Sequence, residues 1–595
     1  MSVLRKKNGI IFNNIYIFSL VWKCNPSYVV ITLIDALIKG CHTSINLLYT
    51  FTLLNSLENS KKIQDIYAII LFYAIYLTLY YLLFYLHKHV YDPLAQNKIR
   101  ISIHKKLFKH AVSVDIECYD NVDFYNNFVW AMNQAHSQAI ALVQNTGKLI
   151  TYLVASITSF GFMVNIDYMV AVLIVALSIC RIILRKTRNN QNFSFRNDCN
   201  EIERKDAYIK RIFSLPNYAK ELRISRIGEV FLDKMKKNTS KKIELEKKYS
   251  KKRIPLDLGL KIIDITGNSL TLIIILYKVM VSRILSIGAF SVTIIGLWQM
   301  SRLLSGLIDY FLKYHELAIF SEKVMEFMDY PTKAEQGGHM LPPLETLEFR
   351  NISFAYSNNK KVLNNVSLKI KKGEKIAIVG YNGAGKTTLI KLLMRLYDPN
   401  EGEILYNGVS IKQYDINCLR RKMSVVFQDY CIFAATIAEN VVSGEFFLED
   451  QNKVTEALDK STFSSKLSSL SKGINTTLTK EFDKEGVQLS GGESQKIAIA
   501  RAFYNDSELI VLDEPSAALD PDSEYFLNKS ITSNSTNKTI IFISHRLSTT
   551  RNADKIYVFE NGRIIEFGNH EELMELNGKY AYLFNLQAEK YINQN

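Results

Sequence analysis

The sequence predicts two unlike halves: an all-α bundle of six membrane-crossing helices with long cytoplasmic helical extensions, followed by an α/β domain. Three observations support this fold class. Residues 1–330 contain 42 Lys plus Arg and 25 Asp plus Glu, whereas residues 331–595 contain 31 and 33, so the basic excess is entirely N-terminal. Long apolar runs share that half. In the other half, short β-rich runs alternate with helical stretches, which is typical of an α/β domain.

Six segments of the N-terminal half are apolar enough to cross a hydrocarbon core, which requires about 20 residues in a helix. The clearest, Ile66–Leu86, has no formal charge. Two further segments, separated only by Asp167, predict a helical hairpin. The predicted spans are Ser27–Leu54, Ile66–Leu86, Leu149–Ile166, Tyr168–Leu184, Leu258–Val281 and Ser286–Ile308.

The residues before the first span predict an interfacial helix that ends near Pro26. The apolar stretch Ile10–Val21 follows three basic residues and imitates a secretory signal, but Asn13 and Asn14 interrupt it and no cleavage site of small residues follows. The predicted domains are the interfacial helix over 1–26, a transmembrane domain over 27–325, a linker over 326–346 and the α/β domain over 347–595.

The distribution of Lys and Arg predicts the orientation, because cytoplasmic loops carry the excess of these residues. The two long connections, 88–148 and 181–253, carry 7 and 22 of them, whereas the three short connections carry four together. We therefore expect a multi-pass protein of the cytoplasmic membrane with both long connections, both termini and the α/β domain in the cytoplasm.

The two long connections are charged and poor in Gly and Pro, so each predicts a helical hairpin rather than a structureless loop. At 1.5 Å per residue, arms of roughly 30 residues reach about 45 Å below the membrane. The basic run Lys234–Arg253 is interpreted as a solvated helix face, because positive-inside topology places such charge beside spans. No nucleic-acid partner is expected. The seven scattered cysteines predict neither a disulfide framework nor a zinc site.

A phosphate-binding loop opens the α/β domain. The expected strand Lys375–Val379 leads into G-x-x-x-x-G-K-T, and a helix is expected over Leu389–Arg395. Glycines in such a loop let backbone N–H groups converge on phosphate oxygens, Lys386 neutralises phosphate charge and the Thr387 hydroxyl binds Mg²⁺. The loop residues are Gly380, Tyr381, Asn382, Gly383, Ala384, Gly385, Lys386, Thr387 and Thr388.

A pair of carboxylates follows a second buried strand, Leu509–Leu512. Ligands of open α/β sheets bind at the carboxyl ends of the strands, so Asp513 and Glu514 are expected beside the phosphate loop. Asp513 suits the Mg²⁺ shell, and Glu514 suits activation of an attacking water.

Between these motifs lies Leu489-Ser490-Gly491-Gly492-Glu493. With this motif the sequence resembles the ATP-binding cassette (ABC) transporters, specifically exporter-type half-transporters of the bacterial kind, which fuse a six-helix membrane domain to one nucleotide-binding domain. The resemblance covers nearly the whole chain. It implies ATP and Mg²⁺ as cofactors and an ATPase coupled to primary active export by alternating access.

The resemblance also assigns roles to single residues. Tyr356 matches the aromatic residue that stacks on adenine. Gln428 matches the glutamine that senses Mg²⁺ and the attacking water, and His545 matches the histidine that contacts the γ-phosphate. Ser490, Gly491, Gly492 and Glu493 match the signature loop, which closes on ATP held by the opposite subunit, and Asp520 matches the D-loop aspartate. The implied catalytic residues are Glu514, His545 and Gln428, and the implied metal ligands are Thr387, Gln428 and Asp513.

Two cytoplasmic turns also match the family, whereas the sequence departs from the family pattern at three places. Tyr119–Tyr125 and Pro216–Arg223 look like the turns that dock on the ATPase domain. Glu493 stands where the family most often has Gln, Ala517 stands where Ser is usual, and residues 481–486 do not follow the usual sequence before the signature. Only the interfacial segment precedes the spans, so no peptidase domain is expected.

One phosphate loop and one signature motif per chain imply a dimer, most simply a homodimer, although a heterodimer with a second half-transporter is also consistent. Two other functions stay open: an ATP-gated channel or regulator with the same fold, and a soluble motor ATPase, which the apolar spans disfavour. The sequence does not identify the substrate, for which a lipid, a peptide and an amphiphilic small molecule are the expected classes. Charged residues within spans are functional candidates, although mutual pairing is the simpler account; these are Asp35, Lys39, Lys261 and Asp264.

Overall fold

The computed structural model describes residues 9–59, 61–282, 286–330, 332, 338–356, 360–517, 519–533, 538–544 and 547–592. The chain forms two compact units, which are treated separately below. The helical unit comprises Met1–Phe108 and Asn127–Met328, and the α/β unit comprises Lys109–Asn126 and Asp329–Asn595. The short segment 109–126 therefore belongs by its contacts to the α/β unit, although helical-unit sequence lies on both sides of it.

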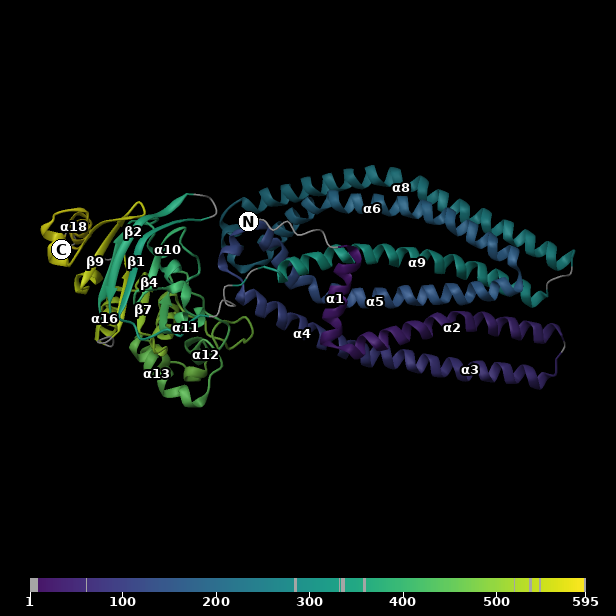
Figure 1. Ribbon diagram of the computed structural model, residues 1–595, viewed down its shortest axis with the longest axis horizontal. Coiled ribbons are helices and arrows are strands. Elements are labelled where there is room, and N and C mark those ends of the chain that lie inside the picture. Colours follow the sequence, from purple (N-terminus) through teal and green to yellow (C-terminus); the bar gives the residue numbers. More distant parts are fainter. Residues whose placement is uncertain are drawn as a thin grey trace. The chain divides into compact units, whose positions relative to one another are not determined.

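The helical unit is built from long helices (Figure 1). Six of the helices in the described part of the chain are long and apolar enough to cross a membrane, in agreement with the six predicted spans. The helices are α1 (Ile10–Cys24), α2 (Pro26–Glu58), α3 (Ile63–Leu86), the π-helical turn η1 (His87–Tyr91), α4 (Asp92–Ser113), α5 (Val122–Ile166), α6 (Tyr168–Ser214), α7 (Ala219–Ile224), α8 (Ile227–Met280) and α9 (Ile287–Met328).

The predicted hairpin at Asp167 is present, and the structure shows why the chain turns there. Asp167 is the only residue between α5 and α6. Its carboxylate accepts hydrogen bonds from the backbone N–H groups of Met169 at 2.9 Å and Val170 at 3.2 Å. It also pairs with Lys278 of α8. Because an Asp at this position satisfies the free N–H groups of a helix start, the carboxylate ends one span and begins the next.

Helix α1 packs on α9 through two buried asparagines. The Asn14 side chain donates to the carbonyl of Tyr314 at 2.9 Å and accepts from Ser321 at 3.3 Å. Asn13 donates to the carbonyl of Ala318 at 3.5 Å. The residues that interrupt the apolar stretch of α1 therefore attach it to a spanning helix, and Figure 1 shows α1 crossing the long helices.

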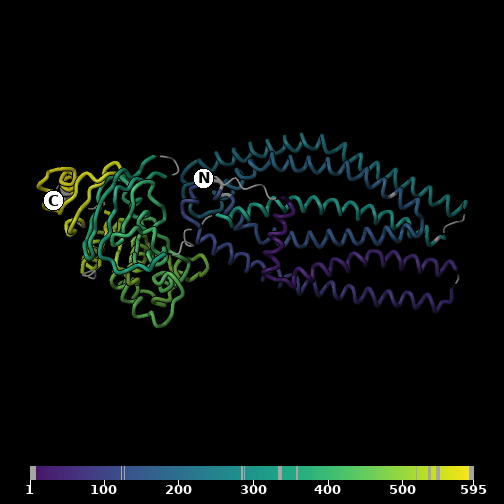
Figure 2. Tube along the Cα trace, in the orientation of Figure 1, coloured from purple at the N-terminus to yellow at the C-terminus, as the bar shows by residue number. Residues whose placement is uncertain are grey.

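Helices α6 and α8 continue far beyond their apolar parts and form the helical extension that the sequence predicts. They have 47 and 54 residues and run side by side (Figure 2). Polar contacts join their charged parts: Tyr249 donates to Asp198 at 2.8 Å, and Asn238 donates to Asp206 at 2.8 Å. The predicted second turn falls on the 3₁₀ turn Pro216–Tyr218 and α7, which connect the two arms.

The charged residues of the spans do not all pair as their spacing suggests. Asp35 and Lys39 form an ion pair within α2, at 2.5 Å. Asp264 of α8 pairs instead with Arg181 of α6, at 2.7 Å, although Lys261 is its near neighbour in sequence. Asp35 is therefore paired within its own helix and Asp264 with a neighbouring helix.

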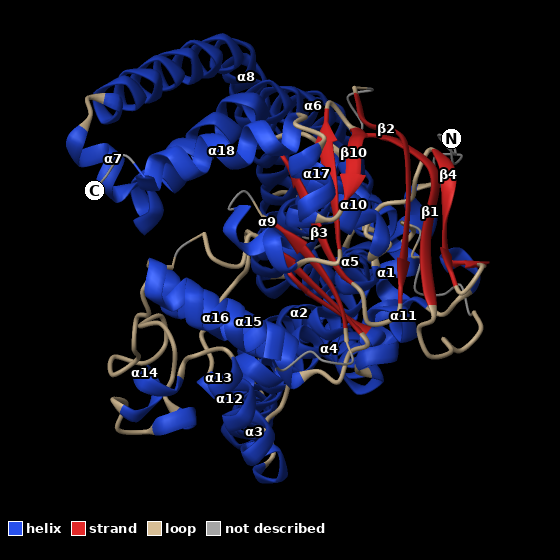
Figure 3. Cartoon of the chain, turned by 90° about the vertical axis from the view of Figure 1, so that its left-hand side faces the viewer, coloured by secondary structure: helices blue, strands red, loops and turns tan. Residues whose placement is uncertain are grey.

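The α/β unit contains two sheets (Figure 3). An antiparallel sheet has the order β2-β1-β4-β5, and a second sheet has the order β10-β9-β3-β8-β7-β6, in which every neighbouring pair except β10 with β9 is parallel. The strands are β1 (Thr346–Ala355), β2 (Lys361–Lys371), β3 (Lys375–Gly380), β4 (Glu401–Tyr406), β5 (Val409–Ser410), β6 (Met423–Val426), β7 (Leu509–Asp513), β8 (Thr539–Ile543), β9 (Lys555–Glu560) and β10 (Arg563–Gly568).

Helices pack around the sheets and bury the strands that lead to the phosphate loop and the carboxylates. Residues of β7 are buried along its whole length, and β3 is buried after its first residue. Since both strands are parallel to β8 between them, their carboxyl ends meet at one edge. The helices are α10 (Lys386–Leu393), α11 (Ile416–Lys422), α12 (Ile437–Val442), α13 (Gln451–Lys460), α14 (Ser464–Ser468), α15 (Gly491–Tyr504), α16 (Pro521–Ser533), α17 (His570–Glu575) and α18 (Lys579–Ile592).

Candidate nucleotide-binding and hydrolysis site

The loop between β3 and α10 has a backbone that requires glycine at two of its positions. Gly380 and Gly385 have φ angles of +150° and +100°. A Cβ atom on Gly380 would lie 2.3 Å from the carbonyl oxygen of Phe559, and one on Gly385 would lie 2.6 Å from Leu363 Cδ2. The loop therefore adopts its shape only because these positions lack a side chain, and it leads directly into the N-terminus of α10.

Lys386 lies inside this loop. The residue is buried, and its ammonium donates to the carbonyls of Gly380 at 2.8 Å and Tyr381 at 3.0 Å. Burial lowers the pKa of Lys386, although the nearby carboxylates of Glu514 and Asp513 oppose that shift. The loop carbonyls thus hold a cation at the start of a helix, a position suited to phosphate.

The two predicted metal ligands from different motifs come together at the sheet edge. The Thr387 hydroxyl, at the start of α10, donates to Asp513 Oδ2 at 2.7 Å. Asp513 ends β7 and is 1 % exposed. Burial raises the pKa of Asp513, and the charge of Glu514 acts in the same direction, whereas the bond from Thr387 opposes it. A hydroxyl and a carboxylate in contact offer the oxygen ligands that Mg²⁺ prefers.

Glu514 occupies a strained backbone position beside Gln428. Its φ angle is +51°, and its N–H donates to the carbonyl of Ile543 on β8 at 2.8 Å. Gln428 Nε2 donates to Glu514 Oε2 at 3.0 Å. Gln495 of α15 donates to the Glu514 carbonyl at 2.9 Å. Left-handed φ at a non-glycine residue is uncommon and concentrates at functional sites. The structure therefore brings the predicted catalytic pair together and adds Gln495, which no sequence argument singled out.

Tyr356 lies at the end of β1, next to the phosphate loop. Its hydroxyl is 3.2 Å from the hydroxyl of Thr388, and its ring contacts those of Phe354 and Tyr397 edge-on. Tyr381 of the loop is 50 % exposed, and the ammonium of Lys579 lies 5.2 Å from its ring centre. The predicted adenine platform thus stands beside the predicted phosphate site, attached to it by a hydroxyl contact.

The predicted signature residues form the start of α15. Ser490 Oγ accepts from the N–H of Glu493 at 3.2 Å, and Glu493 Oε2 accepts from the N–H of Ser490 at 2.8 Å, so the two side chains cap the helix reciprocally. Lys466 pairs with Glu493 at 3.0 Å. Burial opposes ionisation of Glu493, but the Ser490 N–H and the Lys466 ammonium outweigh it and lower the pKa. Gly491 accepts a bond from Tyr430 at 2.8 Å.

Asp520 and His545 are the two remaining predicted residues of the site. Asp520 precedes α16, is exposed, and accepts from the N–H of Ser523 at 2.8 Å, as a helix cap does. His545 lies outside the described residues. Ser544, immediately before it, is buried at the end of β8, beside the strands that carry the phosphate loop and Asp513.

The first predicted cytoplasmic turn lies within the α/β unit, against a groove of about 420 Å³. Tyr397 donates to Asp120 Oδ2 at 2.9 Å. Ile116 lines the groove together with Phe427, the neighbour of Gln428. Burial raises the pKa of Tyr397, and its bond to Asp120 adds to the shift. Tyr397 has no motif around it, so no sequence signal identified this contact.

Comparisons with known proteins agree with this architecture. Residues 363–517 match the sequence profile described as ABC transporter. The chain is 29% identical over 586 residues to the subtilin transport ATP-binding protein SpaT of Bacillus subtilis, covering 97% of this chain and 94% of that protein. Residues 363–517 are therefore an ABC transporter domain, and the chain as a whole resembles ABC exporters.

One further match covers part of the sequence, and another concerns the fold. The chain is 39% identical over 277 residues to an ATP-dependent lipid A-core flippase of Paraburkholderia xenovorans, a match that covers 45% of each protein. A solved bacterial Atm1-family ABC exporter with ATP bound shares the fold, with a TM-score of 0.75 and 22% identity over 95% of this chain and 99% of that one.

The resemblance stated from the sequence is therefore confirmed at the level of family, fold and activity class. Six candidate spans followed by one nucleotide-binding domain give the layout of an exporter-type half-transporter. The ABC transporter is an ATPase coupled to transport, a multi-pass membrane protein and, in outline, an ATP-driven exporter.

Proposed function

We propose that the protein is a half-transporter that forms a homodimer in the cytoplasmic membrane. The dimer uses ATP hydrolysis to export an amphiphilic substrate by alternating access. The proposal rests mainly on two side-chain hydrogen bonds at one edge of the sheet, between Thr387 and Asp513 and between Gln428 and Glu514. These four side chains come from three separate parts of the chain, because Asp513 and Glu514 are consecutive. They supply the oxygen ligands and the carboxylate that ATP hydrolysis requires.

In this proposal each residue has a distinct task. Lys386 exchanges its loop carbonyls for phosphate oxygens, and Thr387 and Asp513 hold Mg²⁺, which when bound offsets the charge of the β- and γ-phosphates. Glu514 accepts the proton of the attacking water, and Gln428 orients that carboxylate through its present hydrogen bond. Tyr356 stacks on the adenine, and His545 contacts the γ-phosphate.

The exposed position of the signature residues supports a dimer. Ser490, Gly491 and Glu493 cap and begin α15, and Ser490 is exposed. In a symmetric dimer this exposed cap faces ATP held by the partner's phosphate loop, and Asp520 lies at the same interface. Both chains carry the same Glu514 and Gln428, so both sites of a homodimer hydrolyse ATP.

Coupling to transport runs through segment 109–126. This segment packs with the α/β unit through Asp120 and Ile116, and it continues at its two ends into α4 and α5. A change of the groove around Phe427 on ATP binding therefore acts on two helices of the membrane domain.

The substrate class is inferred from the named relatives. One is named for transport of subtilin and another is named a lipid A-core flippase. We therefore place the substrate among amphiphilic peptides and lipids. Orientation follows the charge asymmetry, with both termini and the ATPase domain in the cytoplasm.

The test is uptake into inside-out vesicles, in which added ATP reaches the cytoplasmic face. Fluorescent phospholipids, amphiphilic peptides and cationic dyes are offered one at a time, with ATP or with a non-hydrolysable ATP analogue. Accumulation of one class with ATP alone, together with stimulation of ATPase activity by that class, is the expected result. Equal entry with the non-hydrolysable analogue would instead identify a nucleotide-gated channel.

A further inference from the structure

A polar pocket of about 360 Å³ lies among α2, η1 and α5 of the helical unit. Asp35 and Lys39 lie within a predicted span, where ionisable groups are expensive and mark functional sites, and the other ionisable residues lie next to the ends of two further spans. Three lysines, two aspartates and one histidine line it, a net charge of +1 with the histidine neutral. They are Lys39, Lys88, Lys148, Asp35, Asp92 and His87. We call this site the basic pocket.

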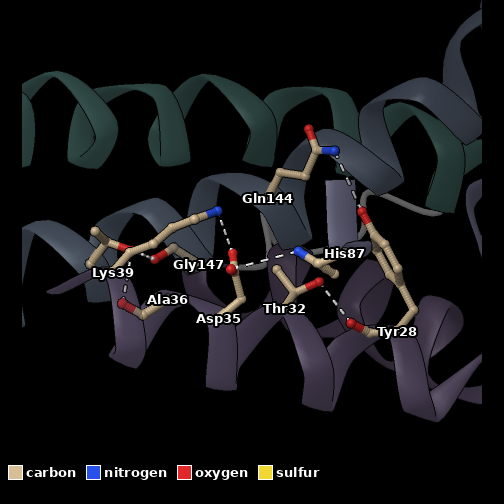
Figure 4. A network of polar contacts seen from close by, with 9 residues as sticks. Tyr28, Thr32, Asp35, Ala36, Lys39, His87, Gln144 and Gly147 are labelled. Atoms are coloured by element: carbon tan, nitrogen blue, oxygen red, sulfur yellow. Dashed lines mark hydrogen bonds and ion pairs between the residues drawn. The ribbon is translucent and has the colours of Figure 1, made fainter. Parts of the chain in front are cut away.

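Each carboxylate oxygen of Asp35 already has a nitrogen neighbour within the basic pocket. Lys39 donates to Asp35 Oδ2 at 2.5 Å, and His87 Nδ1 lies 3.6 Å from Asp35 Oδ1. Figure 4 shows the Lys39 ammonium and the His87 ring approaching the carboxylate from opposite sides. A ligand that carries a positive charge would have to displace one of them.

Donor capacity, in contrast, is left over. His87 Nε2 is buried and has no hydrogen-bond partner, and it can donate when both ring nitrogens are protonated. Lys88 and Lys148 have no carboxylate within ion-pair distance among the residues that the structure describes. Their ammonium groups lie instead over aromatic rings, Lys88 at 5.5 Å from Phe84 and Lys148 at 5.3 Å from Tyr310. Unpaired donors of this kind favour an anion.

The backbone places two of these donors. His87 and Lys88 begin the π-helical turn η1, which inserts between α3 and α4. An i→i+5 turn changes the direction in which the following side chains point, and such turns occur often at functional sites. The Tyr28 hydroxyl, which accepts from Gln144 at 3.5 Å, closes one end of the pocket (Figure 4).

The surroundings show which kind of anion fits. The apolar helix α3 ends at Leu86, directly before the pocket, and has no buried residue. Leu82 and Leu83 are 55% and 61% exposed, and Leu86 is 51% exposed. In a bilayer this surface lies against lipid chains, with the pocket at the end of the apolar span. An amphiphile can place its apolar chain along α3 while its charged group enters the basic pocket.

We infer that the basic pocket binds the anionic head group, a phosphate or a carboxylate, of a membrane-borne amphiphile. This inference rests on the proposed export function, for which it names the charge of the substrate. Lys88, Lys148 and His87 contact the anion, and Asp35 is a positioning residue that holds Lys39 and His87.

The test measures binding without nucleotide, so that it does not depend on transport. The full-length protein in phosphatidylcholine nanodiscs is titrated calorimetrically with octyl phosphate, octyltrimethylammonium or inorganic phosphate, and empty nanodiscs supply the blank. Octyl phosphate should bind, and inorganic phosphate should bind at least tenfold more weakly. Equal binding of both phosphates would identify a site for free anions and overturn the amphiphile assignment.

Two variants and one control locate the site. Lys88→Gln with Lys148→Gln should weaken octyl phosphate binding at least tenfold. Lys98→Gln, at an exposed position of α4 outside the pocket, should leave it unchanged. Asp35→Asn should preserve or tighten octyl phosphate binding, because it releases Lys39. Unaltered binding by the double variant, or octyltrimethylammonium binding that Asp35→Asn abolishes, would overturn the inference.

The two proposals fail separately. Absence of ATP-driven uptake, with variant-dependent binding intact, would remove the export function and leave an anion site. Substrate uptake that the double variant does not alter, combined with unaltered octyl phosphate binding, would remove the basic pocket and leave the export function.

Discussion

Gly380 and Gly385 in the nucleotide site have φ angles of +150° and +100°, and Glu514 has one of +51°, whereas Asp35, His87 and Lys148 of the basic pocket all lie on helices. In the first site an unusual backbone, supported by buried strands, places the polar groups. In the second, neighbouring helices bring together residues that are far apart in sequence. The first site should therefore be sensitive to any added Cβ atom, and the second only to the side chains that line it.

The largest expected effect is that of Glu514→Gln. The amide keeps the shape of the side chain and can still contact Gln428, but it cannot accept the proton of water. A general base contributes about 10²–10⁴-fold to a rate, so phosphate release should fall by about 100-fold or more while ATP binding persists. The matched control is Glu481→Gln, at an exposed position before the signature. Wild-type turnover by Glu514→Gln would refute the assigned role.

Gly385→Ala tests the dependence on backbone shape. The new Cβ would lie 2.6 Å from Leu363 Cδ2 and 3.0 Å from the Val362 carbonyl, at a φ that L side chains rarely adopt. Such strain costs on the order of 1–3 kcal/mol, so binding of a fluorescent ATP analogue should weaken by about tenfold or more. Gly161→Ala, on α5 with no atom within 4 Å of its Cβ, should bind the analogue normally. Equal affinities would show that the loop tolerates a side chain.

Tyr397→Phe should separate hydrolysis from coupling. It removes the hydroxyl that donates to Asp120 at 2.9 Å, and hydrogen bonds to charged groups contribute about 1.5–3 kcal/mol. We expect basal ATPase activity to persist and its stimulation by the transported substrate to decrease. The control is Tyr557→Phe, which loses a bond to the carbonyl of Lys369 elsewhere in the α/β unit. Unchanged stimulation would exclude this hydroxyl from coupling.

Much of the nucleotide site was predictable because its residues occupy contiguous motifs with fixed spacing. Lys386, Thr387 and Asp513 were identified with their strands, and the structure brings them together as expected. The six spans and the turn at Asp167 were predictable from composition alone, because length and charge suffice to define a membrane helix.

Other features depend on packing between distant parts of the chain, which no local pattern encodes. The spacing of Lys261 and Asp264 suggested a pair, but Arg181 of α6 reaches Asp264 instead. The contacts of Tyr397 with Asp120 and of Gln495 with Glu514 span large sequence separations. The π-helical turn His87–Tyr91 lies just before Pro93, which interrupts helical hydrogen bonding but does not by itself specify a π-helical turn.

Glu493→Gln should give the smallest effect, because the side chain is partly exposed and only its ion pair with Lys466 is lost. An amide oxygen can still accept from the Ser490 N–H, so the helix cap and ATPase activity should be retained. A surface ion pair contributes less than about 1 kcal/mol, which corresponds to a small decrease in thermal stability at pH 7. The folded-state pKa of Glu493 lies below its ordinary value of 4.5, so this stabilisation is present above that value and disappears as the pH falls through the folded-state pKa.

Thermal unfolding of the purified protein near pH 7 and in acid measures this dependence. The difference between wild type and Glu493→Gln should be present near neutrality and vanish in acid. Glu485→Gln, which breaks a more exposed pair with Lys472, should show no difference at either pH. A large loss of ATPase activity in Glu493→Gln would mean that the carboxylate itself, rather than the cap it forms with Ser490, acts in the signature loop. The signature helix would then, like the basic pocket, depend on the charge of a single side chain rather than on its backbone.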